Sequence, residues 1–259
     1  MTTPAPARTA GPVLLACDLD GTLLDHGSRP VPGAGEVLEE LIRAGAVFVV
    51  VTGRPVQSAR RATEALGVEP EIFACYHGAL IAEADGTVLR HRPVPPRLGR
   101  AVIDRAHAAG VAVTVWDVDE PRELEPGADV AHEPGSAASR LVLHGDPDTV
   151  AGLLTELREQ WAGRLRVSPI RPGFIGVFAP DVDKGDALRF VAAHLGVPLA
   201  RTVACGDGSA DETLLAAAAM RVAVGEEPHE LGRLEDVVVT GWERLPSTLR
   251  ALVFPLLAT

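Results

Sequence analysis

The chain has 259 residues, of which 47% are hydrophobic and 23% are charged, and its formal net charge at pH 7 is −11. This length and composition predict a globular protein with one large or two smaller domains. The negative charge argues against nucleic acid or an anionic membrane as a partner, and no apolar run approaches the ~18 residues that a membrane-spanning helix needs.

Residues 1–12 are rich in proline, alanine and threonine, and we expect a flexible tail there. The apolar stretch 13–17 is short and ends in turn residues, which is typical of a buried strand. Asp18 and Asp20 follow it, at the edge where open α/β sheets bind their ligands. Because two carboxylates this close repel each other, we expect a cation between them or a proton on one. A solvated acidic turn is the alternative interpretation of this pair taken alone.

A second strand is predicted at 46–51, after a helix whose apolar face begins at Val37 and which ends near Gly45. The strand runs into Thr52-Gly53-Arg54, and another helix is expected to begin at Pro55. This β–α–β succession predicts a parallel sheet with right-handed crossover connections.

The pattern changes in the middle of the chain. We interpret residues 84–181 as a separate α+β insert in which two helices cover one face of a sheet. Its segment 117–139 is acidic and rich in glycine and proline, and we expect an exposed loop there. Just before the insert we predict strands at 72–75 and 79–81. Within it we predict strands at 111–116, 141–144, 165–167 and 176–179 and helices at 96–109 and 150–161.

The core is expected to consist of residues 13–83 and 182–259. Lys184 begins an amphipathic helix, and a strand at 202–205 runs into Gly206-Asp207-Gly208-Ser209-Ala210-Asp211. Two further strands, at 222–224 and 237–239, and a closing helix from Trp242 complete the predicted elements.

The three cysteines, Cys17, Cys75 and Cys205, lie in or beside apolar segments and lack the spacing of metal ligands. The chain also shows no charged start followed by a hydrophobic stretch, as a signal peptide would have. Together these features predict reduced, buried thiols in a cytoplasmic protein.

Four polar segments occur in a fixed order along the predicted core: the pair Asp18 and Asp20, the hydroxyl of Thr52, then Lys184, then the acids around Asp207. This ordered set resembles the four motifs of the haloacid dehalogenase (HAD) superfamily of phosphohydrolases, over nearly the whole chain. The resemblance implies an α/β fold with a Rossmann-like parallel-sheet core. The insert lies between the second and third motifs, and it looks like the α/β cap of the Cof-type sugar phosphatases.

The resemblance also implies a mechanism. Asp18 would be the nucleophile that forms an aspartyl-phosphate, and Asp20 would be general acid and then general base. A carboxyl group can do both only with a pKa near neutrality, so we expect Asp20 to be buried. Asp207 would bind Mg²⁺ together with Asp18 and the backbone of Asp20, and Asp211 is included in the metal site.

The remaining implied roles concern the phosphate. Lys184 would neutralise the nucleophile and the transferring phosphoryl group, Thr52 and the amide of Gly53 would bind it, and Arg54 would contact the substrate. Each residue has a structural alternative. Thr52 could cap a helix, Lys184 could be a solvated residue at a helix start, Asp211 an acid of a helix N-terminus, and Arg54 part of a surface salt bridge.

Six polar residues in or near the insert could contact a sugar substrate: His77, Arg122, His132, Arg140, His144 and Arg171. The alternative for each is an exposed surface residue without a role in binding. Two positions depart from the Cof-type pattern, in which Asn is usual at both. Ala210 stands where that Asn helps to hold the phosphate, and His77 stands before Gly78.

We therefore predict a Mg²⁺-dependent HAD-type phosphatase, a phosphomonoesterase for a small sugar-like phosphate, as a monomer or dimer. Two alternatives stay open. One is a disaccharide-phosphate phosphatase of the trehalose-phosphate or mannosylglycerate-phosphate type. The other is a HAD-fold binding protein with degraded catalysis, which the departure at Ala210 suggests.

Overall fold

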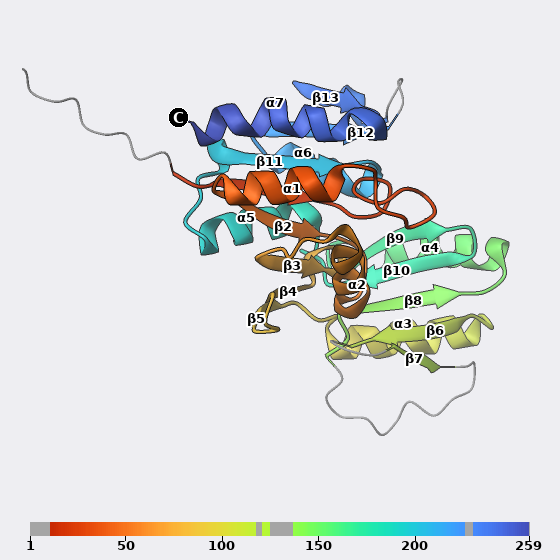
Figure 1. The fold of residues 1–259 in the computed structure, drawn as a ribbon. Helices are drawn as coiled ribbons and strands as arrows, with labels where there is room; N and C mark the ends of the chain where they lie inside the picture. Colours follow the sequence, from red (N-terminus) through yellow and green to blue (C-terminus); the bar gives the residue numbers. More distant parts are fainter. Residues whose placement is uncertain (1–10, 118–120, 125–136, 226–229, 259) are drawn as a thin grey trace, which may run out of the picture. The chain divides into compact units, whose positions relative to one another are not determined.

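The computed structural model describes residues 11–117, 121–124, 137–225 and 230–258. Most of the predicted tail, residues 1–10, lies outside this range, as does His132. The chain divides into two compact units. The first consists of Met1–Thr52, Ser58–Phe73 and Lys184–Thr259, and the second of Gly53–Gln57 and Ala74–Asp183. The two are described separately below (Figure 1).

The first unit is built on a parallel sheet with the strand order β13-β12-β11-β1-β2, followed by β3. The parallel arrangement is as predicted. The strands are β1 (Val13–Cys17), β2 (Ala46–Val51), β3 (Ile72–Cys75), β11 (Thr202–Gly206), β12 (Met220–Val224) and β13 (Val237–Thr240). The helices are α1 (Ala34–Arg43), α2 (Val56–Leu66), α5 (Lys184–His194), α6 (Glu212–Ala217) and α7 (Leu245–Leu257).

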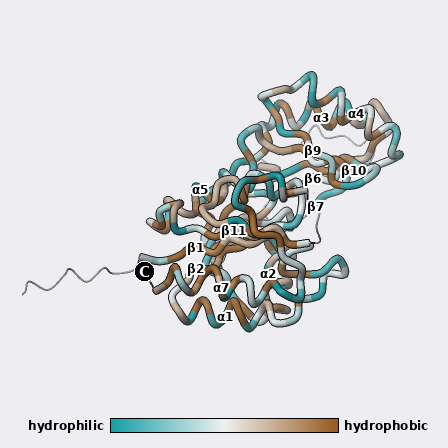
Figure 2. The backbone as a smooth tube through the Cα atoms, turned by 90° about the horizontal axis from the view of Figure 1, so that it is seen from above, coloured by the Kyte–Doolittle hydropathy of each residue, from teal (hydrophilic) through white to brown (hydrophobic). Residues whose placement is uncertain are grey.

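Strand β1 is the centre of this sheet and is buried along its whole length. Its residue Cys17 lies opposite Val50 of β2 on one side and Cys205 of β11 on the other. Helices α1 and α7 cover one face of the sheet, and α5, which contacts α6, covers the other (Figure 2). Covering both faces explains why these strands are nearly continuous apolar runs instead of alternating ones.

Helices α1 and α2 approach each other closely at Gly35 of α1. A Cβ atom at this position would lie 2.0 Å from the carbonyl oxygen of Leu66, the last residue of α2. Only glycine leaves room for the backbone of a neighbouring helix at this distance.

The second unit contains a five-stranded antiparallel sheet with the order β7-β6-β8-β10-β9. Its apolar core joins α3 and α4 to one face of that sheet, as predicted. The elements are β4 (Leu80–Glu83), β5 (Val88–His91), α3 (Pro96–Ala108), β6 (Ala112–Trp116), β7 (Pro121–Leu124), β8 (Arg140–His144), α4 (Pro147–Gln160), β9 (Arg166–Arg171) and β10 (Phe174–Phe178).

Two sequence predictions for this unit were wrong. The segment 117–139 was expected to be a loop, but Pro121–Leu124 forms the edge strand β7. Proline is compatible with an edge strand, since its missing N–H removes no bond needed on the outer side. Strand β5 was not predicted either, because it carries two apolar residues, of which Val88 is 50% exposed.

Short 3₁₀ turns link several elements of both units. They are Tyr76–Gly78, Leu199–Arg201, Ser209–Asp211, Glu230–Arg233 and Trp242–Arg244. Within the described part of the chain, none of the helices has the length and apolar character required to span a bilayer.

Candidate active site

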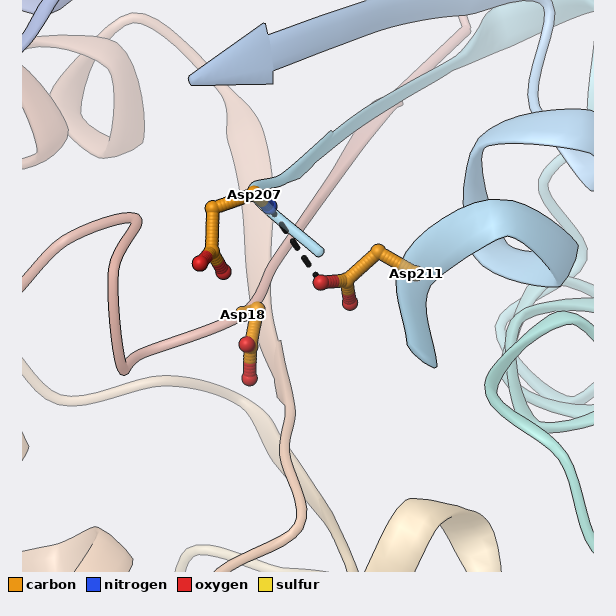
Figure 3. Close-up of side chains that lie close together, drawn as sticks. All are labelled: Asp18, Asp207 and Asp211. Carbon is orange, nitrogen blue, oxygen red and sulfur yellow. Dashed lines mark hydrogen bonds between the residues drawn. The ribbon is translucent and has the colours of Figure 1, made fainter. Parts of the chain in front are cut away.

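Asp18 and Asp207 lie at the carboxyl ends of two neighbouring parallel strands. Asp18 follows β1, Asp207 follows β11, and the backbone N–H of Asp18 donates to the carbonyl of Cys205 at 3.0 Å. Asp211 lies in the 3₁₀ turn Ser209–Asp211, after β11. One carboxylate oxygen of each of the three aspartates lies within 4.8 Å of the other two. Figure 3 shows the three side chains together.

Lys184, the first residue of α5, places its ammonium group between two of these aspartates. Its Nζ lies 2.6 Å from Oδ1 of Asp211 and 3.0 Å from Oδ1 of Asp18. The Lys184 and Asp211 side chains are each 2% exposed. The backbone N–H of Gly185 donates to the hydroxyl of Thr213, at 3.2 Å, which ties the start of α5 to α6. A lysine buried this deeply requires the opposing carboxylates.

Asp211 uses its second oxygen to hold the loop that carries Asp207. Its Oδ2 accepts from the backbone N–H of Asp207 at 3.2 Å and of Gly208 at 3.3 Å, and Figure 3 shows the first of these bonds. A Cβ at Gly206 would lie 2.4 Å from the Cβ of Asp211, so the loop closes only with glycine there. Both oxygens of Asp211 are therefore engaged by protein groups.

The turn after β1 closes on Asp207 from the other side. The hydroxyl of Thr22 donates to Oδ1 of Asp207 at 3.3 Å. Gly21 has φ +78°, and a Cβ there would lie 2.1 Å from Oδ2 of Asp207. The indole N–H of Trp242 donates to the carbonyl of Gly21 at 2.8 Å. Sequence reasoning gave no role to Thr22, although it lies within the first motif, and none to Trp242, whose partner is 221 positions away.

Burial dominates the electrostatics of the two sheet-edge aspartates. It raises the pKa of Asp18 to about 7, against the lowering effect of Lys184 and with a further raising effect of Asp211. It raises the pKa of Asp207 to about 6, again with Asp211 raising and Lys184 lowering it. For Lys184 burial acts to lower the pKa, but the charges of Asp18 and Asp211 outweigh it and the pKa is raised.

The three carboxylates fit a cation. Asp18, Asp207 and Asp211 form the group of acids that could hold a metal ion. With Lys184 as the neighbouring cation, three ionised carboxylates and one ammonium group leave a net charge of −2. A divalent ion with a preference for oxygen ligands would neutralise that charge and relieve the repulsion between the acids, which adds to the effect of burial in raising the two pKa values.

Asp20 is exposed, contrary to the expectation that it is buried. Strand β1 ends at Cys17 and the chain then turns through Gly21, so the rule that alternate residues share a face stops applying after Asp18. The buried residue next to it is Leu19, at 0% exposure.

The predicted phosphate-binding residues are divided between the two units. Thr52, directly after β2, is completely buried in the first unit. Gly53 and Arg54 belong to the second unit, where the carbonyl of Gly53 accepts from the guanidinium of Arg140 at 3.1 Å.

Several of the polar residues suggested as sugar-binding lie beside aromatic rings of the second unit. Arg140 lies over the rings of Tyr76 and Trp116, 5.3 and 4.9 Å from their centroids. His144 stacks on Phe174 at 5.5 Å, with Arg171 3.6 Å from the same ring centroid. Arg122 is partly exposed in β7. His77 has φ 59°, a left-handed conformation in which Asn is also enriched.

The sequence matches a known family over most of its length. The family model of the haloacid dehalogenase-like hydrolases matches residues 15–121 and 122–241. The chain belongs to this family. The resemblance carried by the four motifs is thereby confirmed, as are the α/β fold with a parallel-sheet core and the expectation of a HAD-type phosphatase.

Relatives and solved structures extend this finding. A HMP-PP phosphatase of Cronobacter sakazakii is 23% identical over 243 residues, which cover 87% of this chain and 89% of the relative. A HAD-like hydrolase from B. subtilis aligns with a TM-score of 0.80 at 19% identity, covering 93% of this chain and 99% of the other. A sugar phosphatase of HAD subclass IIB aligns with a TM-score of 0.73 at 18% identity, covering 94% and 99%. These structural likenesses show a shared fold.

Proposed function

We propose that this HAD-family protein is a Mg²⁺-dependent phosphomonoesterase that acts on a small sugar-like phosphate through an aspartyl-phosphate. The observation that carries the proposal is the buried ammonium of Lys184, 3.0 Å from Oδ1 of Asp18, beside a second sheet-edge carboxylate at Asp207. A carboxylate that is buried, paired with a lysine and next to a cation site suits nucleophilic attack on a phosphoryl group.

The proposed reaction has two displacements. A carboxylate oxygen of Asp18 bonds to phosphorus as the bond to the sugar oxygen breaks, and Asp20 gives its proton to that oxygen. Asp20 then takes a proton from a water molecule, whose oxygen attacks the same phosphorus and releases Asp18 and inorganic phosphate. After the first displacement Asp20 is a carboxylate, and it therefore can act as the base in the second.

Asp18 and Asp207 are the proposed side-chain ligands of the metal, with the backbone carbonyl of Asp20. When bound, Mg²⁺ would supply positive charge to the phosphoryl oxygens. Asp211 was included among the metal residues on sequence grounds. Because both of its oxygens are already hydrogen-bonded, we assign it to holding Lys184 and the Asp207 loop.

Thr52 and the amide of Gly53 are the proposed phosphate donors, and Arg54 the proposed substrate contact. The insert 84–181 is the proposed cap that distinguishes one leaving group from another. The preference for a sugar-like substrate rests on the Cof-type resemblance and on the sugar phosphatase among the aligned structures. The relative named HMP-PP phosphatase makes that compound the first non-sugar to test.

A substrate panel with Mg²⁺ tests the proposal. Hexose and pentose phosphates, HMP-PP and an aryl phosphate are assayed with the wild type and with D18N. We expect Mg²⁺-dependent release of phosphate from at least one sugar phosphate, and none from D18N, since an amide is not a nucleophile. A matched control is D25N, in an exposed loop, which should keep its activity. Binding of these compounds without any turnover would instead support the degraded binding protein.

A further inference from the structure

Trp242 connects the end of β13 to the turn that carries the first motif. It begins the 3₁₀ turn Trp242–Arg244, and its indole N–H donates to the carbonyl of Gly21 at 2.8 Å. The ring of His26 packs against the indole edge-on, with the centroids 5.0 Å apart. One short hydrogen bond and one ring contact thus fix the indole against the segment that follows β1.

Gly21 is in turn pressed against Asp207. Its backbone adopts φ +78°, and an added Cβ would lie 2.1 Å from Oδ2 of Asp207. The next residue, Thr22, donates its hydroxyl to Oδ1 of the same carboxylate at 3.3 Å. The turn therefore limits where the Asp207 carboxylate can point, and the bond from Trp242 limits where the turn can be.

The indole also borders an open cavity beside this carboxylate. The cavity has a volume of about 500 Å³. Its lining includes Gly21, His26, Asp207 and Trp242. Asp207 thus contacts Gly21 and Thr22 but also borders the open space of this cavity. A carboxylate with one open side has room to rotate unless the packed side is held firmly.

We propose that Trp242 is a positioning residue for the cation site: its N–H bond to Gly21 holds the Asp207 carboxylate in the orientation that binds a divalent cation. The inference rests on the proposed function only in taking Asp18 and Asp207 as the ligands of Mg²⁺. Removing the N–H should weaken binding of the cation and leave the chemistry at Asp18 intact. The cost of a lost neutral hydrogen bond corresponds to about threefold to tenfold in affinity.

The test is calorimetric titration of the full-length protein with Mg²⁺ in the absence of substrate. W242F, which keeps a large ring but loses the N–H, should bind Mg²⁺ about threefold to tenfold more weakly. Its kcat at saturating Mg²⁺ should stay close to that of the wild type. The control is W161F, in the apolar core of the second unit, which should lower the melting temperature without changing Mg²⁺ affinity.

The outcomes separate the two proposals. If the wild type does not bind Mg²⁺, or if D207N binds it as tightly as the wild type, the proposed function fails. If the wild type binds Mg²⁺ at Asp207 and W242F binds it equally well, the positioning role is wrong.

A second measurement does not depend on W242F folding. The chain has three tryptophans, so W116F/W161F leaves Trp242 as the single emitter. Its fluorescence should change on titration with Mg²⁺, with the midpoint found by calorimetry. Emission that stays constant while Mg²⁺ binds would overturn the inference.

Discussion

At the scale of single residues, the aspartates of the site differ in how many of their carboxylate oxygens are bound by other protein groups. Asp211 has both oxygens hydrogen-bonded, one to Lys184 and one to backbone N–H groups. Asp18 pairs with Lys184 through Oδ1, and Asp207 accepts from the hydroxyl of Thr22 through Oδ1, so the side-chain contacts described above use one carboxylate oxygen of each. This difference separates a residue that holds the site together from residues that can meet a cation or a phosphate.

D211N tests the structural role. The Asn amide oxygen can still accept the backbone N–H groups of Asp207 and Gly208, but the negative charge beside Lys184 is lost. The buried ammonium of Lys184 then has only the carboxylate of Asp18 as a charged partner among the contacts described above. We expect a loss of about 2–4 kcal/mol of unfolding free energy. E212Q, at the next position, is the control, because the pair of Glu212 with Arg233 is exposed and worth less than about 1 kcal/mol. Equal stability of the two variants would contradict the assignment.

Substitution of Ala210 by asparagine is predicted to raise the activity. It lies in the 3₁₀ turn Ser209–Asp211, between the loop of Asp207 and α6. An Asn side chain there could donate to a charged phosphate oxygen, and A210N should raise kcat/KM by about tenfold to a hundredfold. A216N, on the exposed side of α6, should leave it unchanged. A lower or equal kcat/KM for A210N would mean that the contact is not missing or that the site has no room for it.

At the scale of elements, the sequence predicted what depends on local pattern and missed what depends on distant partners. The apolar runs that form β1, β2 and β11 were predicted, and with them the common sheet edge of Asp18 and Asp207. The bond from Trp242 to Gly21 spans 221 positions and leaves no periodicity to detect. Asp20 was expected to be buried because of its implied acid–base role, but β1 ends at Cys17 and the turn that follows leaves Asp20 exposed.

Helix packing gives a prediction at this scale. G35A places a methyl group 2.0 Å from the carbonyl oxygen of Leu66, and since that atom is backbone, α1 and α2 must move apart. We expect a loss of about 1–3 kcal/mol, seen as a lower melting temperature. G152A is the contrast: it lies within α4 with nothing within 4 Å of its added Cβ, and it should stabilise by about 0.5–1 kcal/mol. The opposite order of melting temperatures would contradict the packing argument.

At the scale of the whole molecule, the chain forms two compact units whose boundaries differ from the predicted ones. Residues 53–57 and 74–83 group with the second unit, whereas sequence reasoning placed them in the core. The first unit ends its two early segments at Thr52, directly after β2, and at Phe73, inside β3, so the composition of the sequence does not change at these points. Strands β4 and β5, which pair antiparallel, group with the second unit, and β5 has a weak apolar signal in the sequence.

Cation binding should be visible in the stability of the intact protein. The acids of the first unit repel one another without a cation, so Mg²⁺ should raise the melting temperature, by an amount equivalent to about 2.7 kcal/mol at a hundredfold excess over Kd. A chelator should reverse the effect. D207N should show no rise, because it lacks the proposed ligand. An equal rise in D207N would place the cation elsewhere.

The central claim is that Asp18 carries the phosphoryl group. The most direct measurement is to quench the enzyme during turnover, reduce it with borohydride and map the peptides by mass spectrometry. An aspartyl-phosphate is reduced to homoserine, so we predict homoserine at position 18 in the presence of substrate and Mg²⁺, and none when the chelator replaces Mg²⁺. Homoserine at another aspartate, or none at position 18 while substrate is being turned over, would contradict the account.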